Sequence, residues 1–205
     1  MPVHLIGSGG RAVLDIPSTC TFHAVLRVVG EAAPSGQLAD ATVHCPRKGC
    51  VQGSECIDCV HLQAYRARPE VRMYCTVDHR DPVRYWMRPK PPATTVETRC
   101  PAADEFAARR GVHHLLVFDR ELRLAGLACR CDLARGGDRA VEDVMSRDVF
   151  AIEPTTLLGV AATAMKRLRI GCLPVVSGPL VLGILTRRDL DRAGVPADWD
   201  TMPPT

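Results

Sequence analysis

The octapeptide GILTRRDL, residues 183–190, decides the fold of this chain because a second copy precedes it. The earlier copy is GLACRCDL, residues 126–133, and both copies place glycine first, arginine fifth and Asp-Leu last. The flanks match as well, since VHHLLVF at 112–118 corresponds to IGCLPVV at 170–176. Internal repetition with matching flanks indicates a structural unit that occurs twice.

Each copy predicts the order strand, helix, strand, strand, helix. In the second copy a short strand, DVFAI, ends before Pro154, and apolar residues at i, i+3, i+4 and i+7 between 157 and 168 predict an amphipathic helix. Hydrophobic strands at 170–176 and 180–185 follow, and the last helix begins near 189. In the first copy a shorter helix spans roughly 101–111 and ends at Gly111.

The segment 141–190 resembles a CBS domain, the regulatory module named after cystathionine beta-synthase. The resemblance depends on the DVM opening at 143–145, LPVV at 173–176 and the octapeptide at 183–190. The first copy is similar to a weaker CBS domain that lacks the DVM opening. The resemblance implies a tandem CBS pair, called a Bateman module, that dimerises with a second copy and binds adenine nucleotides or related adenosyl ligands between its repeats.

Candidate ligand residues lie where the last strand of the second repeat ends. A carboxylate such as Asp189 can accept hydrogen bonds from ribose hydroxyls, and the Thr186 hydroxyl with the helix start can hold phosphate. Arginines add charge-assisted bonds to phosphate oxygens. An ordinary helix cap by Thr186, with Asp189 favoured by the helix dipole, explains the same residues. The predicted site comprises Thr186, Arg187, Arg188 and Asp189, with Val149, Phe150 and Ile170 around the base.

The first repeat predicts a weaker or phosphate-poor site. Arg130 and Asp132 are retained, but Cys129 replaces the hydroxyl and Cys131 replaces the second arginine. Neither repeat offers a nucleophile with a base at fixed spacing, so we expect a sensor rather than an enzyme.

Composition places the chain among globular proteins, with 205 residues, 46% hydrophobic and 24% charged. The net charge of +3 is too small to imply nucleic-acid binding by itself. The N-terminal segment lacks the pattern of a secretory signal, and no apolar run approaches the roughly 20 residues of a membrane span. These features predict a cytoplasmic protein without a membrane segment.

Five of the ten cysteines crowd into residues 45–75. Without an export signal, metal or redox chemistry explains them better than disulfides. The C-x-x-C spacing of Cys56 and Cys59 is typical of a metal knuckle, and two strand-like runs end at Cys45 and Cys75. We therefore predict a structural zinc site with four sulfur ligands, Cys45, Cys56, Cys59 and Cys75, with Cys50 or His79 as substitutes.

Other interpretations of the cysteines stay open at this stage. An iron–sulfur cluster accepts the same ligands. A redox dithiol at Cys56 and Cys59 would make the protein a thiol oxidoreductase. Unliganded cysteines are the remaining explanation.

A basic and aromatic run follows the cysteines and suggests a nucleic-acid-binding regulator as the alternative function. Glu70, Asp78 and Asp81 dilute its charge, so a solvated face is the simpler explanation. The run contains Arg66, Arg68, Arg72, Arg80, Arg84, Arg88 and Lys90, interleaved with Tyr65, Tyr74, Tyr85 and Trp86.

The predicted fold class is α+β, a tandem CBS pair preceded by a small, mainly β, cysteine-rich module. Strand-like runs in the first forty residues are expected to support the cysteine site. Trp199, in the tail, is expected to touch the domain. The predicted division is an N-terminal segment at 1–40, the cysteine module at 41–87, the repeats at 88–137 and 138–194, and a loosely ordered tail at 195–205.

Overall fold

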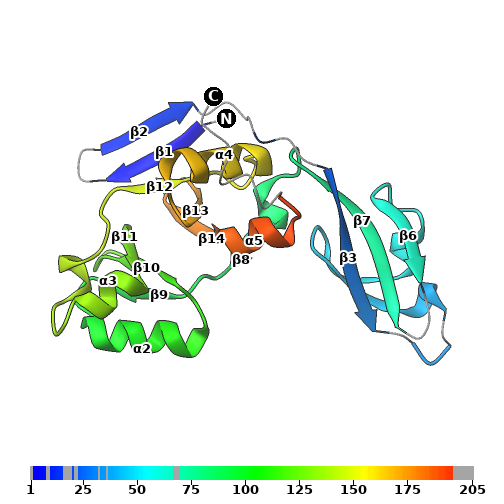
Figure 1. Cartoon of the computed structure of the whole chain (residues 1–205), viewed down its shortest axis with the longest axis horizontal. Helices are drawn as coiled ribbons and strands as arrows, with labels where there is room; N and C mark the ends of the chain where they lie inside the picture. Colours follow the sequence, from blue (N-terminus) through cyan, green and yellow to red (C-terminus); the bar gives the residue numbers. More distant parts are fainter. Residues whose placement is uncertain are drawn as a thin grey trace.

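The computed structural model consists of two bodies, and the chain passes from the smaller to the larger at the end of strand β7 (Val71–Asp78) (Figure 1). Trp199 and Arg68, which the sequence analysis singled out, lie outside the described residues, as does the tail after residue 195. Among the helices that are described, none is long and apolar enough to cross a membrane. The structure describes residues 2–7, 10–15, 20, 23–31, 33–35, 37–66 and 70–195.

The smaller body is a five-stranded antiparallel sheet with the strand order β5-β4-β3-β7-β6. Alternate residues of β7, such as Val71 and Met73, are buried, as expected for a strand with one face on a core. The chain approaches itself closely at Gly53, where an added Cβ would lie 1.8 Å from the carbonyl oxygen of Leu38. The elements are β3 (His23–Glu31), η1 (Leu38–Asp40), β4 (Thr42–Cys45), β5 (Gly49–Gln52), α1 (Ser54–Ile57), β6 (Leu62–Arg66) and β7 (Val71–Asp78).

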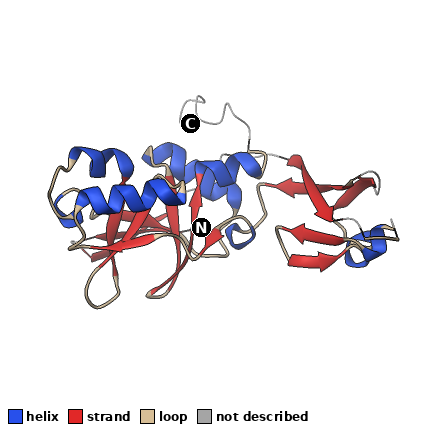
Figure 2. Ribbon diagram, turned by 90° about the horizontal axis from the view of Figure 1, so that it is seen from below, coloured by secondary structure: helices blue, strands red, loops and turns tan. Residues whose placement is uncertain are grey.

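The larger body contains both repeats, each with the predicted order of elements. Its helices lie along one face of its strands (Figure 2). The first repeat has β9 (Ala93–Thr95), α2 (Cys100–Arg110), β10 (His114–Phe118), β11 (Leu124–Cys129) and α3 (Arg130–Arg135). The second has β12 (Val149–Ala151), α4 (Leu158–Leu168), β13 (Cys172–Ser177), β14 (Leu180–Thr186) and α5 (Arg187–Arg192).

The two repeats exchange their opening segments. The opening of the first repeat, η2 (Val83–Tyr85) and β8 (Arg88–Pro89), reaches the second repeat, where β8 pairs with β14. The opening of the second, η3 (Val141–Asp143), leads to Ser146, which bridges to Leu127 in β11 of the first. Each repeat is therefore completed by residues of the other.

This exchange explains why both octapeptides begin with glycine. A Cβ on Gly183 would lie 2.6 Å from the carbonyl oxygen of Arg88. A Cβ on Gly126 would lie 2.7 Å from the carbonyl oxygen of Ser146. At both positions an opening segment crosses the strand too closely for any side chain.

The structure differs from the predicted division at residues 83–87. The sequence analysis placed them in the cysteine module, yet Val83 and Trp86 are fully buried in the core around Leu158, Leu173 and Leu185. Residues 83–87 form the opening of the first repeat, in the place of the DVM motif that this repeat lacks.

The N-terminal residues also differ from expectation. A hairpin of β1 (Pro2–Gly7) and β2 (Gly10–Asp15) adds to β12, with Leu5 opposite Phe150. The hairpin thus extends the second repeat rather than supporting the cysteines. β3, in contrast, lies at the centre of the cysteine-bearing sheet as expected.

Candidate ligand cavity and cysteine cluster

A cavity of about 230 Å³ lies between the repeats, where the end of β14 faces the start of β10. Its walls combine apolar surface from Val112 and Ile184 with a set of cationic and polar groups. Among the described residues that line it, none carries a carboxylate, so the cavity suits an anionic ligand. The polar lining comprises Arg88, His113, His114, Thr186, Arg187 and Arg188.

Asp189 is fully buried and does not line this cavity. The backbone N–H and the hydroxyl of Thr186 donate to its Oδ2 at 2.9 and 2.6 Å. Arg88 Nε lies 3.2 Å and Arg192 Nη2 3.3 Å from its Oδ1. In this structure the Asp189 carboxylate caps α5 and pairs with Arg88 at the cavity. This arrangement corresponds to the helix-cap explanation and not to a ribose contact.

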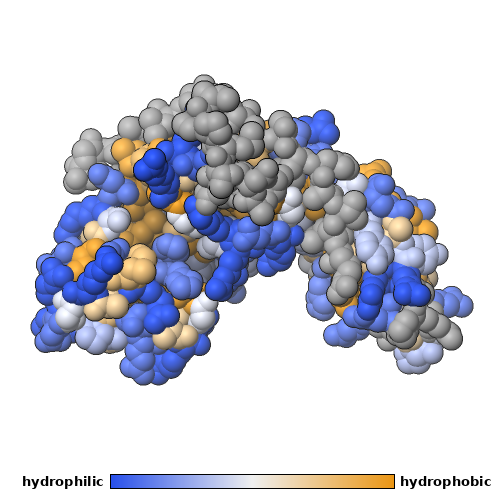
Figure 3. Space-filling view, viewed as in Figure 1, coloured by the Kyte–Doolittle hydropathy of each residue, from blue (hydrophilic) through white to orange (hydrophobic). Residues whose placement is uncertain are grey.

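The residues predicted to surround the base lie elsewhere. Phe150 and Ile170 line a second cavity of about 180 Å³ together with Cys129 of the first repeat, and Val149 is buried and lines neither cavity. Because the opening segments are exchanged, Phe150 faces the site of the first repeat rather than Thr186. The surface between the repeats is correspondingly hollowed and partly apolar (Figure 3).

Sequence reasoning missed two residues of the first cavity. Arg88 was assigned to a basic run, and its position opposite Gly183 follows only from the strand exchange. His114 lines both cavities, whereas the sequence alone left open whether it lies at the cleft or on the surface. Burial, and secondarily the neighbouring His113, lowers the pKa of His114, so its imidazole is neutral at neutral pH.

The retained residues of the first repeat do not line either cavity. Arg130 pairs with Asp104 at 2.7 Å, and Asp132 is half-buried beside it in α3. Cys129 takes the capping position of Thr186, and its sulfur accepts the N–H of Cys131 at 3.3 Å.

Burial raises the pKa of Cys172, on the wall of the second cavity, to about 12, with Cys129 adding to the effect. The Cys172 thiol is therefore neutral at neutral pH.

The four predicted cysteine ligands converge on one small cavity of about 50 Å³ in the five-stranded body. β3 lies between β4 and β7, so the strands that carry Cys45 and Cys75 are not neighbours in the sheet. Neither Cys50, which is exposed, nor His79 lines the cavity, whereas His61 does. The cavity lining includes Cys45 at the end of β4, Cys56 in α1, Cys59 just after it and Cys75 in β7.

The thiols of this cluster influence one another. Burial, followed by the neighbouring Cys45, Cys56 and Cys59, raises the pKa of Cys75 to about 11. Burial, followed by Cys45 and Cys59, also raises the pKa of Cys56. Within the described part of the chain, however, no group of three or more His, Cys, Asp or Glu side chains is arranged to hold a metal ion. The structure thus gives no support for bound zinc, which stays a prediction.

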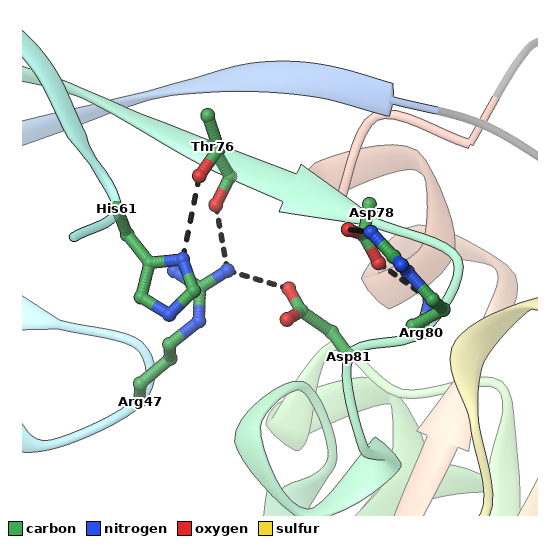
Figure 4. A network of polar contacts seen from close by, with 6 residues as sticks. All are labelled: Arg47, His61, Thr76, Asp78, Arg80 and Asp81. Carbon is green, nitrogen blue, oxygen red and sulfur yellow. Dashed lines mark hydrogen bonds and ion pairs between the residues drawn. The ribbon is translucent and has the colours of Figure 1, made fainter.

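Arg47 joins the cysteine module to the repeats (Figure 4). Its side chain is only 9% exposed, and Nη2 donates to the carbonyl oxygen of Thr76 and to Asp81 Oδ2, both at 2.6 Å. The guanidinium also lies over the ring of Trp86, 5.9 Å from its centroid. Thr76 belongs to the module, whereas Trp86 belongs to the opening of the first repeat and Asp81 directly precedes that opening, so one side chain spans the joint.

Three of the described arginines in the basic run are paired with carboxylates. Arg72 pairs with Glu70, Arg80 with Asp78 and Arg88 with Asp189, and Trp86 is buried in the repeats. Neutralised and dispersed charges make a poor nucleic-acid footprint.

Comparison with known proteins identifies the class of the larger body. Residues 141–195 match the CBS domain. Inosine-5'-monophosphate dehydrogenase of Nitrosopumilus maritimus (strain SCM1) is 30% identical over 88 residues, which cover 42% of this chain and 18% of that protein. The chain therefore spans less than a fifth of the length of this curated relative.

Solved structures show the same fold over both repeats. The CBS domain pair of protein MJ0100, solved with 5'-methylthioadenosine and S-adenosyl-L-methionine, is 25% identical with a TM-score of 0.51 and covers 55% of this chain and 94% of that one. CBSX2 in complex with AMP gives the same identity and TM-score, covering 55% of this chain and 95% of that one. The chain contains a CBS domain, and its larger body has the fold of a tandem CBS pair.

Proposed function

We propose that this chain is a regulatory protein, not an enzyme, that senses an adenine nucleotide in the cavity between its CBS repeats. The observation that carries the proposal is the cavity itself, which three arginines line without a carboxylate among the described residues. The ligands of the two structural relatives, AMP in one and adenosyl compounds in the other, support an adenosyl group.

The charge of the cavity favours a ligand with phosphate. Arg88, Arg187 and Arg188 can each form charge-assisted hydrogen bonds to phosphate oxygens, and the Thr186 hydroxyl lies on the same wall. S-adenosylmethionine carries a sulfonium in place of phosphate and would meet these cations unfavourably. AMP, ADP or ATP is therefore the expected class of signal.

Arg88 connects the ligand to the regulatory response. It lines the cavity, pairs with the buried Asp189, and belongs to the opening segment that crosses from the first repeat to the second. A phosphate that draws Arg88 from Asp189 would shift this segment. The size of such a switch is limited by the difference in ligand affinity between the two states.

We expect AMP, ADP or ATP to raise the thermal stability of the wild-type chain, while adenosine and S-adenosylmethionine do so less. A ligand that binds only the folded state adds about 2.7 kcal/mol at a hundred times its Kd. Arg188→Ala should weaken nucleotide binding about tenfold, a typical value for one charge-assisted bond. Thermal unfolding with and without ligand measures the first effect, and titration calorimetry measures the second.

The matched control is Arg167→Ala. Arg167 is also exposed, but it lies at the end of α4 and does not line the cavity. Equal affinities for the two variants would overturn the proposed position of the phosphate. The absence of binding by all nucleotides would leave the repeats without a sensing role.

A further inference from the structure

The cysteine cavity is built differently from the ligand cavity and lies in the other body. Four thiols reach it from β4, α1, the turn after α1, and β7. Two cations, Arg47 and Lys48, line it as well, and no carboxylate does so among the described residues. Four sulfurs with adjacent positive charge suit a soft cation rather than Mg²⁺ or Ca²⁺, which prefer oxygen ligands.

We propose that Cys45, Cys56, Cys59 and Cys75 form a four-thiolate site for a divalent ion of the zinc class, and that Arg47 transmits the occupancy of this site to the joint with the CBS pair. The proposal does not rest on the nucleotide site. Because the described thiols are not arranged to hold a metal ion in this structure, the proposal requires them to move together around the ion.

Binding of a divalent ion by the four thiols requires no oxidant or reductant. One divalent cation replaces four thiol protons, which are released to solvent, and four metal–sulfur bonds form. The resulting complex carries two net negative charges, which the adjacent Arg47 and Lys48 offset. All four positions are filled by protein, so the site would be structural and not catalytic.

Such a cross-link would stabilise the smaller body. Its core consists mainly of short aliphatic side chains around Val43 and Met73, and both Cys56 and Cys75 pack against that core. Domains with so little apolar core commonly gain stability from a structural metal. The ion would cross-link the end of β4, the α1 segment and β7.

Arg47 is placed to sense this cross-link. It is two residues after Cys45, and its guanidinium donates to the carbonyl oxygen of Thr76, the residue after Cys75. On the other side it holds Asp81 and covers the ring of Trp86. The carbonyl oxygen of Trp86 in turn accepts a bond from Arg192, which pairs with Asp189. A movement of the segment after Cys45, or of β7 around Cys75, would therefore shift a side chain that is anchored in the CBS pair.

The first test uses Co²⁺ and Zn²⁺ with the full chain under reducing conditions. We expect one ion per chain and, for Co²⁺, the thiolate-to-metal charge-transfer absorption and visible bands of a tetrahedral sulfur site. Cys56→Ser or Cys59→Ser should abolish stoichiometric binding. Cys50→Ser and Cys131→Ser, which replace exposed cysteines outside the cavity, should leave one ion bound.

Three results would overturn the metal site. The first is the absence of this absorption in the wild type, with thiol reactivity unchanged by Zn²⁺. The second is a disulfide between Cys56 and Cys59 in the purified protein, which indicates a redox dithiol. The third is iron with acid-labile sulfide in place of zinc. Because the wild type decides these outcomes, misfolding of a serine variant does not affect them.

The second test concerns Arg47 and uses hydrogen exchange. Removing Zn²⁺ from the wild type with a chelator should increase exchange in the segment from Asp81 to Trp86. The double substitution Arg47→Met and Asp81→Asn removes the ion pair without leaving a buried charge unpaired. In this variant Co²⁺ should still bind, but exchange at the joint should no longer respond to metal. A response equal to that of the wild type would overturn the role of Arg47.

Discussion

Replacing Asp189 with alanine is expected to lower the free energy of unfolding by about 3 kcal/mol or more, the usual cost of removing one partner from a buried ion pair. The carboxylate is fully buried and is contacted by Thr186, Arg88 and Arg192. Its loss leaves Arg88 without its buried counter-charge and removes a helix cap, which alone contributes about 1 kcal/mol. Urea unfolding followed by circular dichroism measures the change.

Asp132→Ala is the matched control, because Asp132 holds the equivalent position in the first repeat and is only half-buried. We expect it to cost less than about 1 kcal/mol, as is usual for partly exposed positions. Equal losses at the two positions would contradict the structural role of Asp189. The same reasoning limits the use of Asp189→Ala in ligand binding, since lost affinity could follow from lost structure; Arg188→Ala avoids this ambiguity.

The elements of the repeats were predictable because their signals are local. The amphipathic stripe of α4, the glycine that ends α2 and the β strands around each octapeptide depend only on neighbouring residues. The exchange of opening segments is not local. It places Arg88 against β14 and Phe150 in the cavity of Cys129, which no spacing within one repeat indicates.

In the cysteine module, too, the local features were predictable and the long-range pairing was not. The C-x-x-C spacing and two further cysteines were enough to predict which thiols converge. The insertion of β3 between β4 and β7 was not predictable, because strand order depends on long-range pairing. Arg47 gave no sequence signal of its joining role, since that role depends on Asp81 and Trp86 being folded onto the other body.

Trp86 provides the sharpest test of where the CBS pair begins. Trp86→Ala should cost about 3–5 kcal/mol, the typical loss on truncating a buried aromatic side chain. The indole is fully buried in the core of the second repeat, although the residue belongs to the opening of the first repeat in sequence. Denaturant unfolding measures the loss, and hydrogen exchange locates it. We expect the largest increase in exchange in β13 and β14.

The control for Trp86→Ala is Tyr65→Ala, which truncates an aromatic residue of β6 that is 55% exposed. Its cost should stay below about 1 kcal/mol, because little apolar surface is removed from a core. If Trp86→Ala instead increased exchange mainly in β3, β4 and β7, residues 83–87 would belong energetically to the cysteine module. If exchange increases in β13 and β14, the opening of the first repeat is part of the core of the second, and the two repeats cannot fold as independent units.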